Sequence, residues 1–260
     1  MGLRNAVKVW GDVLDPSLDE KAAPSLGDIF LESPGETAIY LDPAEFFKRT
    51  LITERHLEIL EDVAKALSGE GGSKVIMLQS LFGGGKTHTL VMLLHAVKNP
   101  QALKLAKLSD PRLEGRREEV IAKLGALAER NVVVIDGKVE ALAPHPGIPL
   151  QAGVYKVRTL WGAIAHQLGV YGEVREHDEK IIVPGHDVLV RVLDGRNAVI
   201  LIDEVAHYVF NLISSPDMTI KDYAKQVPLF FENLAKAVDL ARGAVLIVSL
   251  PIEVLSLIHI

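Results

Sequence analysis

Five consecutive residues, Gly83-Gly84-Gly85-Lys86-Thr87, have the types and spacing needed to hold a chain of phosphates. A tight glycine turn lets backbone N–H groups point inward around the phosphates, and the N-terminus of a following helix adds partial positive charge at the same place. Lys86 is predicted to reach the β- and γ-phosphates, and the Thr87 hydroxyl is predicted to bind Mg²⁺. An apolar run before the loop, Lys74–Gln79, predicts a buried strand, and Lys86–Val97 predicts a helix. This strand, loop and helix form the context that a phosphate-binding loop requires.

The loop departs from the common pattern G-x-x-x-x-G-K-[ST] at its first glycine, where Ser80 stands. The additional glycines Gly83 and Gly84 can supply the lost backbone freedom. The alternative is a flexible turn that happens to precede a lysine. The predicted nucleotide contacts are Ser80, Leu81, Phe82, Gly83, Gly84, Gly85, Lys86, Thr87, His88 and, on a later strand, Ser249.

A second apolar run, Ala198–Asp203, ends in a carboxylate that is followed by Glu204. Ligands of open α/β sheets bind at the carboxyl ends of strands. Asp203 is therefore predicted to hold Mg²⁺ with Thr87, and Glu204 to act as the general base on the attacking water. A strand that merely ends in acidic loop residues is the alternative, which the glycine-rich loop upstream disfavours. Ser249 ends a further apolar run. Its side chain could sense the γ-phosphate, or it could be an ordinary serine at the end of a strand, and the two interpretations are equally open.

The segments around Lys86 and Asp203 resemble the additional-strand, catalytic-glutamate division of P-loop ATPases, which includes AAA+ and RecA-like proteins. More narrowly, the chain resembles a prokaryotic ATPase family catalogued as domain of unknown function 499. The segments that carry this resemblance are Tyr40–Thr50 (YLDPAEFFKRT), Gln79–Thr89 (QSLFGGGKTHT), Arg158–Gly162 (RTLWG) and Leu201–Tyr208 (LIDEVAHY). The resemblance implies a longer protein, encoded beside DNA methylases and helicases in gene clusters suspected of phage defence.

Four apolar runs that alternate with helical patterns predict a parallel sheet covered on both faces. We expect a three-layer α/β/α core of the P-loop NTPase type, truncated after the fourth strand. The runs are Lys74–Gln79, Asn131–Asp136, Ala198–Asp203 and Ala244–Ser249. The predicted helices are 53–68, with Thr53 as N-cap and Gly69 as its end, and 86–97, 101–108, 117–128, 159–168, 187–193, 204–212 and 220–240, the last broken near Pro228.

The predicted domain organisation has three parts. Residues 1–52 are expected to be a loop-rich lead-in with a short strand at Ala38–Leu41, and 53–254 the ATPase core. An insertion of helices and loops is expected at about 137–197, with loop over 137–157. Leu255–Ile260 is interpreted as a non-native tail, because it resembles a translated sequencing-library transposon end; the alternative is the start of a native strand or helix.

Composition limits the classes of function. The 260 residues carry a formal charge of −6, which argues against coating nucleic acid by bulk charge but leaves room for a local basic groove. The absence of cysteine excludes a disulfide framework, a thiolate metal site and a cysteine nucleophile. No apolar run could span a bilayer and no secretion signal is visible, so a cytoplasmic protein without membrane contact is expected. The interleaved charges around Arg112, Arg116 and Arg117 predict a solvated face.

The first functional hypothesis is an ATP hydrolase that drives or gates a larger assembly or homo-oligomer, with DNA as a possible partner. Its catalytic residues would be Lys86 and Glu204, and its cofactors ATP and Mg²⁺. The second is a nucleotide-dependent switch or scaffold with little turnover. A small-molecule phosphotransferase ranks last, because the Asp203-Glu204 pair favours water as the nucleophile. Arg158 and Arg242 could each act as a finger toward phosphate, but ordinary surface arginines are the better interpretation.

Overall fold

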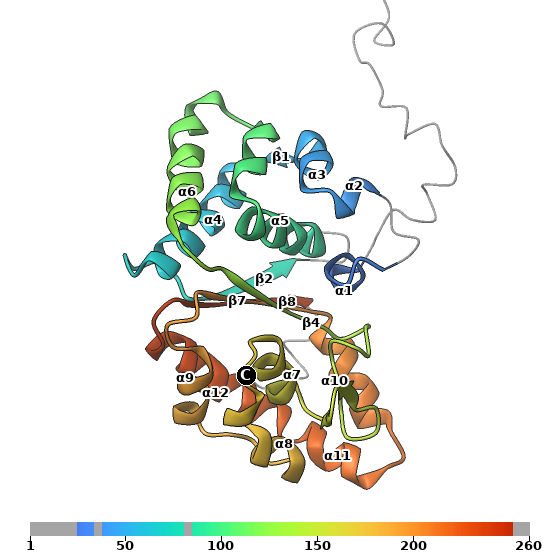
Figure 1. Cartoon of the computed structure of the whole chain (residues 1–260). Helices are drawn as coiled ribbons and strands as arrows, with labels where there is room; N and C mark the ends of the chain where they lie inside the picture. Colours follow the sequence, from blue (N-terminus) through green and yellow to red (C-terminus); the bar gives the residue numbers. More distant parts are fainter. Residues whose placement is uncertain (1–24, 34–37, 81–84, 252–260) are drawn as a thin grey trace, which may run out of the picture.

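A four-stranded parallel sheet forms the centre of the molecule (Figure 1). The computed structural model describes residues 25–33, 38–80 and 85–251. The strand order is β2 (Val75–Ser80), β8 (Ala244–Pro251), β7 (Ala198–Asp203) and β4 (Asn131–Asp136). All four predicted strands are present, and β8 lies between β2 and β7 although it comes last in the chain. The prediction that the first of them is buried is wrong, because β2 is an edge strand whose Val75 and Met77 side chains are exposed.

Helices cover both faces of the sheet, so the predicted three-layer α/β/α architecture is confirmed (Figure 1). The upper layer in Figure 1 holds α1 (Leu26–Phe30), α2 (Ala38–Leu41), α3 (Pro43–Arg49), α4 (Glu54–Ser68), α5 (Lys86–Lys98) and α6 (Glu114–Ala126). The lower layer holds α7 (Leu160–Gln167), α8 (Arg175–Lys180), α9 (His186–Leu193), α10 (Val205–Ser214), α11 (Met218–Ala224) and α12 (Val227–Leu240). Strand side chains alternate between two cores: Val199 and Leu201 pack above the sheet, Ile200 and Ile202 below it.

The N-terminal lead-in differs from the prediction, because its described residues are mostly helical and pack on the core. Ala38–Leu41 is the helix α2, so the predicted strand there is wrong. Two contacts explain the difference: the ring of His95 bonds the backbone oxygen of Tyr40 (2.8 Å), and Asp42 caps the adjoining α3. Tertiary contacts of this kind override the strand preference of a short apolar run.

Two further predicted helices differ in the structure. The predicted helix 101–108 is a 3-10 helix, Pro100–Leu105, followed by strand β3 (Lys107–Leu108), which pairs with β1 (Leu51–Ile52). The predicted helix 220–240 is two helices, α11 and α12, with Pro228 in the first turn of α12, where a missing N–H costs nothing. Other helices agree with the prediction to within a few residues.

The predicted solvated face around the arginine cluster is wrong for Arg117. This side chain is buried and donates to the backbone oxygen of Ala106 (2.9 Å), so it ties α6 to the segment before β3. Arg116 binds Glu61 on α4 through two nitrogens. Arg116 and Arg117 therefore join elements, whereas the Arg112 side chain is 89% exposed and pairs with the nearby Asp110, as predicted for a solvated face.

The segment between β4 and β7 contains more structure than predicted. Within 137–157, strands β5 (Leu150–Ala152) and β6 (Tyr155–Val157) form an antiparallel hairpin. Its two-residue turn begins with Gly153 at φ +60°, a conformation that favours glycine. A short 3-10 helix, Tyr171–Glu173, and α8 lie farther along this segment.

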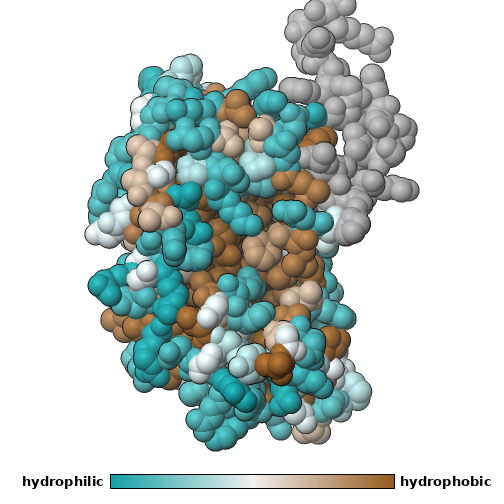
Figure 2. Space-filling view, in the orientation of Figure 1, coloured by the Kyte–Doolittle hydropathy of each residue, from teal (hydrophilic) through white to brown (hydrophobic). Residues whose placement is uncertain are grey.

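Figure 2 shows apolar surface across the middle of one face, at the level of the sheet in Figure 1. Strand β2 forms one edge of this sheet, and its Val75 and Met77 side chains are exposed. Over the residues that the structure describes, none of the helices combines the length and the apolar character that crossing a bilayer requires.

Candidate active site

Three of the predicted residues meet at the carboxyl edge of the sheet. The carboxylate of Asp203, at the end of β7, accepts a hydrogen bond from the Thr87 hydroxyl on α5 (2.7 Å). It also accepts one from the Ser249 hydroxyl on β8. These residues are far apart in the sequence, and they meet because parallel strands present their carboxyl ends at one edge.

The N-terminus of α5 faces this cluster. Gly85 precedes the helix at φ +74°, and no side chain caps the first turn. Lys86 and Thr87 are the first two residues of the 13-residue helix, so its positive dipole end lies beside Asp203. Of the other predicted loop residues, Leu81, Phe82, Gly83 and Gly84 lie outside the described residues, as does the side chain of Ser80.

Glu204 occupies a strained backbone conformation directly after β7. Its φ is +54°, which is uncommon for a residue with a side chain, although Glu32, Ile181 and Asn197 also have positive φ. The turn lies against Gly137, where a Cβ atom would come within 2.1 Å of the Glu204 backbone oxygen. The Glu204 carboxylate pairs with the Lys138 ammonium at 2.6 Å. The predicted base is therefore held at the site by a cation that the sequence analysis did not identify.

Asp136 is a second carboxylate that the sequence analysis passed over. It ends β4 directly opposite Asp203 in the strand register and has no exposed surface. It accepts backbone N–H groups from Gly27 on α1 (2.9 Å) and from Lys138 (3.0 Å). Burial raises the pKa of Asp136, and the negative charges of Asp203 and Glu204 add to the effect. The apolar run that ends in this aspartate was the available signal; nothing in the sequence pointed to Lys138.

His88 follows the phosphate-loop residues, but its ring packs on α3. The ring centre lies 4.9 Å from that of Phe46, and Nε2 is 3.5 Å from the Thr50 hydroxyl. Burial lowers the pKa of His88, which favours the neutral ring near pH 7. His88 thus links the start of α5 to the N-terminal segment, and its predicted contact with phosphate stays a prediction.

The two arginines considered as fingers have other partners. Arg242 forms an ion pair with Asp194 (2.7 Å), and the Arg158 guanidinium donates to the backbone oxygen of Glu179 (3.2 Å). Both arrangements favour the interpretation as ordinary surface arginines.

The donor set at the site fits a magnesium ion. No group of three or more histidine and carboxylate side chains that could hold a metal occurs in the part of the chain that the structure describes. A single carboxylate and a hydroxyl, Asp203 and Thr87, are suited to Mg²⁺ when phosphate oxygens and water complete its octahedron. This chemistry matches a metal that arrives with a phosphate ligand.

A comparison with protein-family models matches the DUF499 N-terminal domain over residues 1–256. The chain belongs to the DUF499 family. The resemblance of the sequence to DUF499 is thereby confirmed, and the match covers nearly the whole chain. Searches of curated proteins and of solved structures gave no match.

Proposed function

We propose that this DUF499 chain binds ATP with Mg²⁺ and hydrolyses it, as a P-loop ATPase of the additional-strand, catalytic-glutamate division. The observation that carries the proposal is the contact of Thr87 and Ser249 with Asp203 beside the uncapped N-terminus of α5. The strand order supports it as well, because β8 is inserted between the strand of the glycine-rich loop and the strand of Asp203. That inserted strand is the feature after which the division is named.

Each residue then has a distinct task. The α5 N-terminus and Lys86 bind the phosphates, and Thr87 and Asp203 hold the metal, whose charge offsets that of the phosphate oxygens. Ser249 keeps the Asp203 carboxylate oriented through its hydroxyl. Glu204 orients the attacking water and takes its proton. The Lys138 ammonium competes with that water for the same carboxylate, so productive geometry requires the pair to open.

ATP turnover in this proposal drives or gates a larger assembly or a homo-oligomer in the cytoplasm. DNA-directed phage defence follows from the family resemblance alone. The second candidate is a nucleotide-dependent switch with little turnover. The pairing of Glu204 with Lys138 and the engagement of Arg158 and Arg242 elsewhere favour slow hydrolysis by the isolated chain.

Titration of Mg²⁺·ATP into the chain tests the proposal, with Lys86→Ala as the variant. Lys104→Ala is the matched control, because it removes one half-exposed lysine charge elsewhere. Loss of a charged phosphate contact is expected to weaken binding by roughly tenfold or more in Lys86→Ala and not in the control. Equal binding by both folded variants contradicts the nucleotide site. Phosphate release without any acceptor supports hydrolysis over phosphotransfer, and tight binding without release favours the switch.

A further inference from the structure

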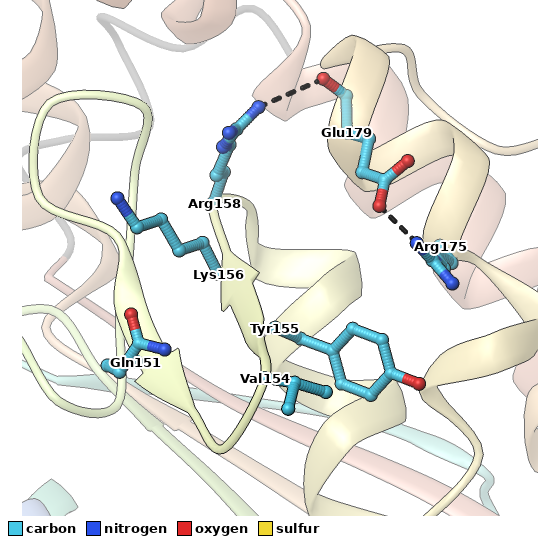
Figure 3. Close-up of a pocket in the computed structure, with 7 residues that line it drawn as sticks. All are labelled: Gln151, Val154, Tyr155, Lys156, Arg158, Arg175 and Glu179. Carbon is cyan, nitrogen blue, oxygen red and sulfur yellow. Dashed lines mark hydrogen bonds and ion pairs between the residues drawn. The ribbon is translucent and has the colours of Figure 1, made fainter.

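An open pocket lies away from the candidate active site, between the β5–β6 hairpin and α8 (Figure 3). Its volume is about 550 Å³. The lining residues are Gln151, Val154, Tyr155, Lys156, Arg158, Arg175 and Glu179. The segment that carries Arg158 is one that the sequence singled out and that the proposed ATPase chemistry does not use.

Positive charge predominates in this pocket. Three cations and one carboxylate line it, so the lining carries a net charge of +2 within a chain of net charge −6. Glu179 pairs with Arg175 (2.8 Å), and Arg158 reaches only the backbone oxygen of Glu179. The exposed Lys156 side chain makes no hydrogen bond or ion pair with the described residues. Two cations are therefore available to an anionic ligand.

Aromatic and apolar side chains also line the pocket, and Figure 3 shows the Tyr155 ring on the side of Arg175, pointing away from Lys156. Tyr155 is 39% exposed, its ring lies 5.1 Å from that of Tyr171, and the Arg175 guanidinium lies 5.2 Å from its centre. Val154, at the hairpin tip, is 89% exposed. An exposed aromatic ring among cations is the arrangement on which unpaired nucleic-acid bases stack.

A buried carboxylate fixes the wall of the pocket. Asp178 has no exposed surface and accepts the Arg158 N–H (3.1 Å), the Thr159 hydroxyl (2.5 Å) and the Tyr171 hydroxyl (2.8 Å). A Cβ atom at Gly162 would come within 2.2 Å of the same carboxylate, so only glycine fits there. These contacts hold the backbone of Arg158 and the ring of Tyr171, which packs on Tyr155. The pocket wall therefore loses little conformational entropy when a ligand binds.

We propose that this pocket binds single-stranded nucleic acid, with phosphates on Lys156 and Arg158 and a base on Tyr155. Lys156 lies in β6 and Arg158 directly follows that strand, so their Cα atoms are at most about 7 Å apart, which is comparable with one nucleotide step of an extended strand. An acidic polypeptide would also pair with the cations, but its carboxylates offer no planar ring to stack on the exposed part of Tyr155. The pocket shares no residue with the candidate nucleotide site, so this proposal does not depend on ATP binding.

Fluorescence anisotropy with a labelled oligothymidylate of about 20 nucleotides tests this proposal on the full chain without ATP. Lys156→Glu is expected to weaken binding at least tenfold. It should also reduce the slope of log affinity against log salt by about 0.7, the contribution of one phosphate contact on a single strand. Tyr155→Ala should weaken binding while leaving that slope unchanged. Lys48→Glu, the same charge reversal on α3 in the other helical layer, is expected to bind as the unmodified chain does.

Thermal melting of each variant establishes that it is folded, which is expected of Lys156→Glu because that side chain is exposed and makes no hydrogen bond or ion pair with the described residues. The proposal is overturned if Lys156→Glu and Lys48→Glu bind the oligonucleotide equally, or if the unmodified chain fails to bind it at low salt. Polyglutamate that displaces the oligonucleotide at equal charge concentration would also overturn it, by assigning the pocket to acidic polypeptides. Retained ATP binding in Lys156→Glu shows that the two sites are separate.

Discussion

The carboxyl ends of β7 and β4 carry the same residue at the same level of the sheet and use it differently. Asp203 and Asp136 are neighbours in register, and both are buried. Asp203 accepts side-chain hydroxyls from α5 and β8 as well as the backbone N–H of Glu204, whereas among the described residues Asp136 accepts only backbone N–H groups, from α1 and its own turn. Hydroxyls can rotate toward a metal, while backbone donors are fixed. The neighbours of a carboxylate thus decide whether it is available for chemistry or anchors the fold.

The largest expected effect is that of Asp203→Asn on ATP turnover. A neutral amide holds Mg²⁺ poorly, and we expect turnover to fall by roughly 100-fold to 1,000-fold. Phosphate release at saturating Mg²⁺·ATP measures the effect. Asp136→Asn is the matched change one strand away and should keep turnover within a few-fold. Equal losses in the two variants would show that the strand ends do not differ in function.

Asp136→Ala is expected to have the largest effect on stability. It leaves the buried N–H group of Gly27 and the partly buried N–H group of Lys138 without an acceptor, and a buried donor left unpaired costs about 1–3 kcal/mol. We expect the free energy of unfolding to fall by about 2–4 kcal/mol, measured by urea denaturation. Asp136→Asn keeps one acceptor oxygen and should lose less. A variant as stable as the unmodified chain would contradict an anchoring role.

The pH dependence of stability gives a smaller effect with a definite sign. Burial raises the pKa of Asp136 in the folded chain above its ordinary value of 3.8, so the folded state holds this proton more tightly than the unfolded state. The favourable contribution of Asp136 to the free energy of unfolding is fully present below pH 3.8 and is lost as the pH rises through the raised pKa. Relative to Asp136→Asn, the unmodified chain should therefore lose stability as pH rises across this window. Urea denaturation at a series of pH values measures the difference, and an increase toward neutral pH would refute the assignment.

Lys138→Met is expected to have the smallest effect on stability and a modest one on turnover. The Lys138–Glu204 pair is partly exposed, so its loss should change the free energy of unfolding by less than about 1 kcal/mol. Turnover should rise several-fold, because Glu204 no longer has to leave the ammonium before it contacts water. Steady-state phosphate release measures this, with Lys104→Ala as the control for loss of a surface charge. A fall in turnover would instead make Lys138 part of the catalytic machinery.

Local patterns were sufficient for the elements that carry the candidate site. Continuous apolar runs are typical of strands in a covered parallel sheet, so they specified β2, β4, β7 and β8, although β2 lies at the sheet edge with Val75 and Met77 exposed. The glycine cluster before a helical pattern specified the start of α5, and the residue after each apolar run specified Asp203 and Ser249. These predictions hold because each depends on a few adjacent residues and on the common edge at which parallel strands end.

Tertiary structure decided what depends on distant partners. Three features join residues that are far apart in the chain, so no local sequence pattern predicts them. They are the insertion of β8 beside β7, the contact of Gly27 with Asp136 and the pairing of Lys138 with Glu204. The same is true of α2, whose apolar residues suit a strand until His95 bonds the Tyr40 oxygen. The sequence by itself determined which segments are buried and where their polar ends lie. Only the folded chain decided which of those polar ends meet, because hydrogen bonds between distant residues form only after the cores have packed.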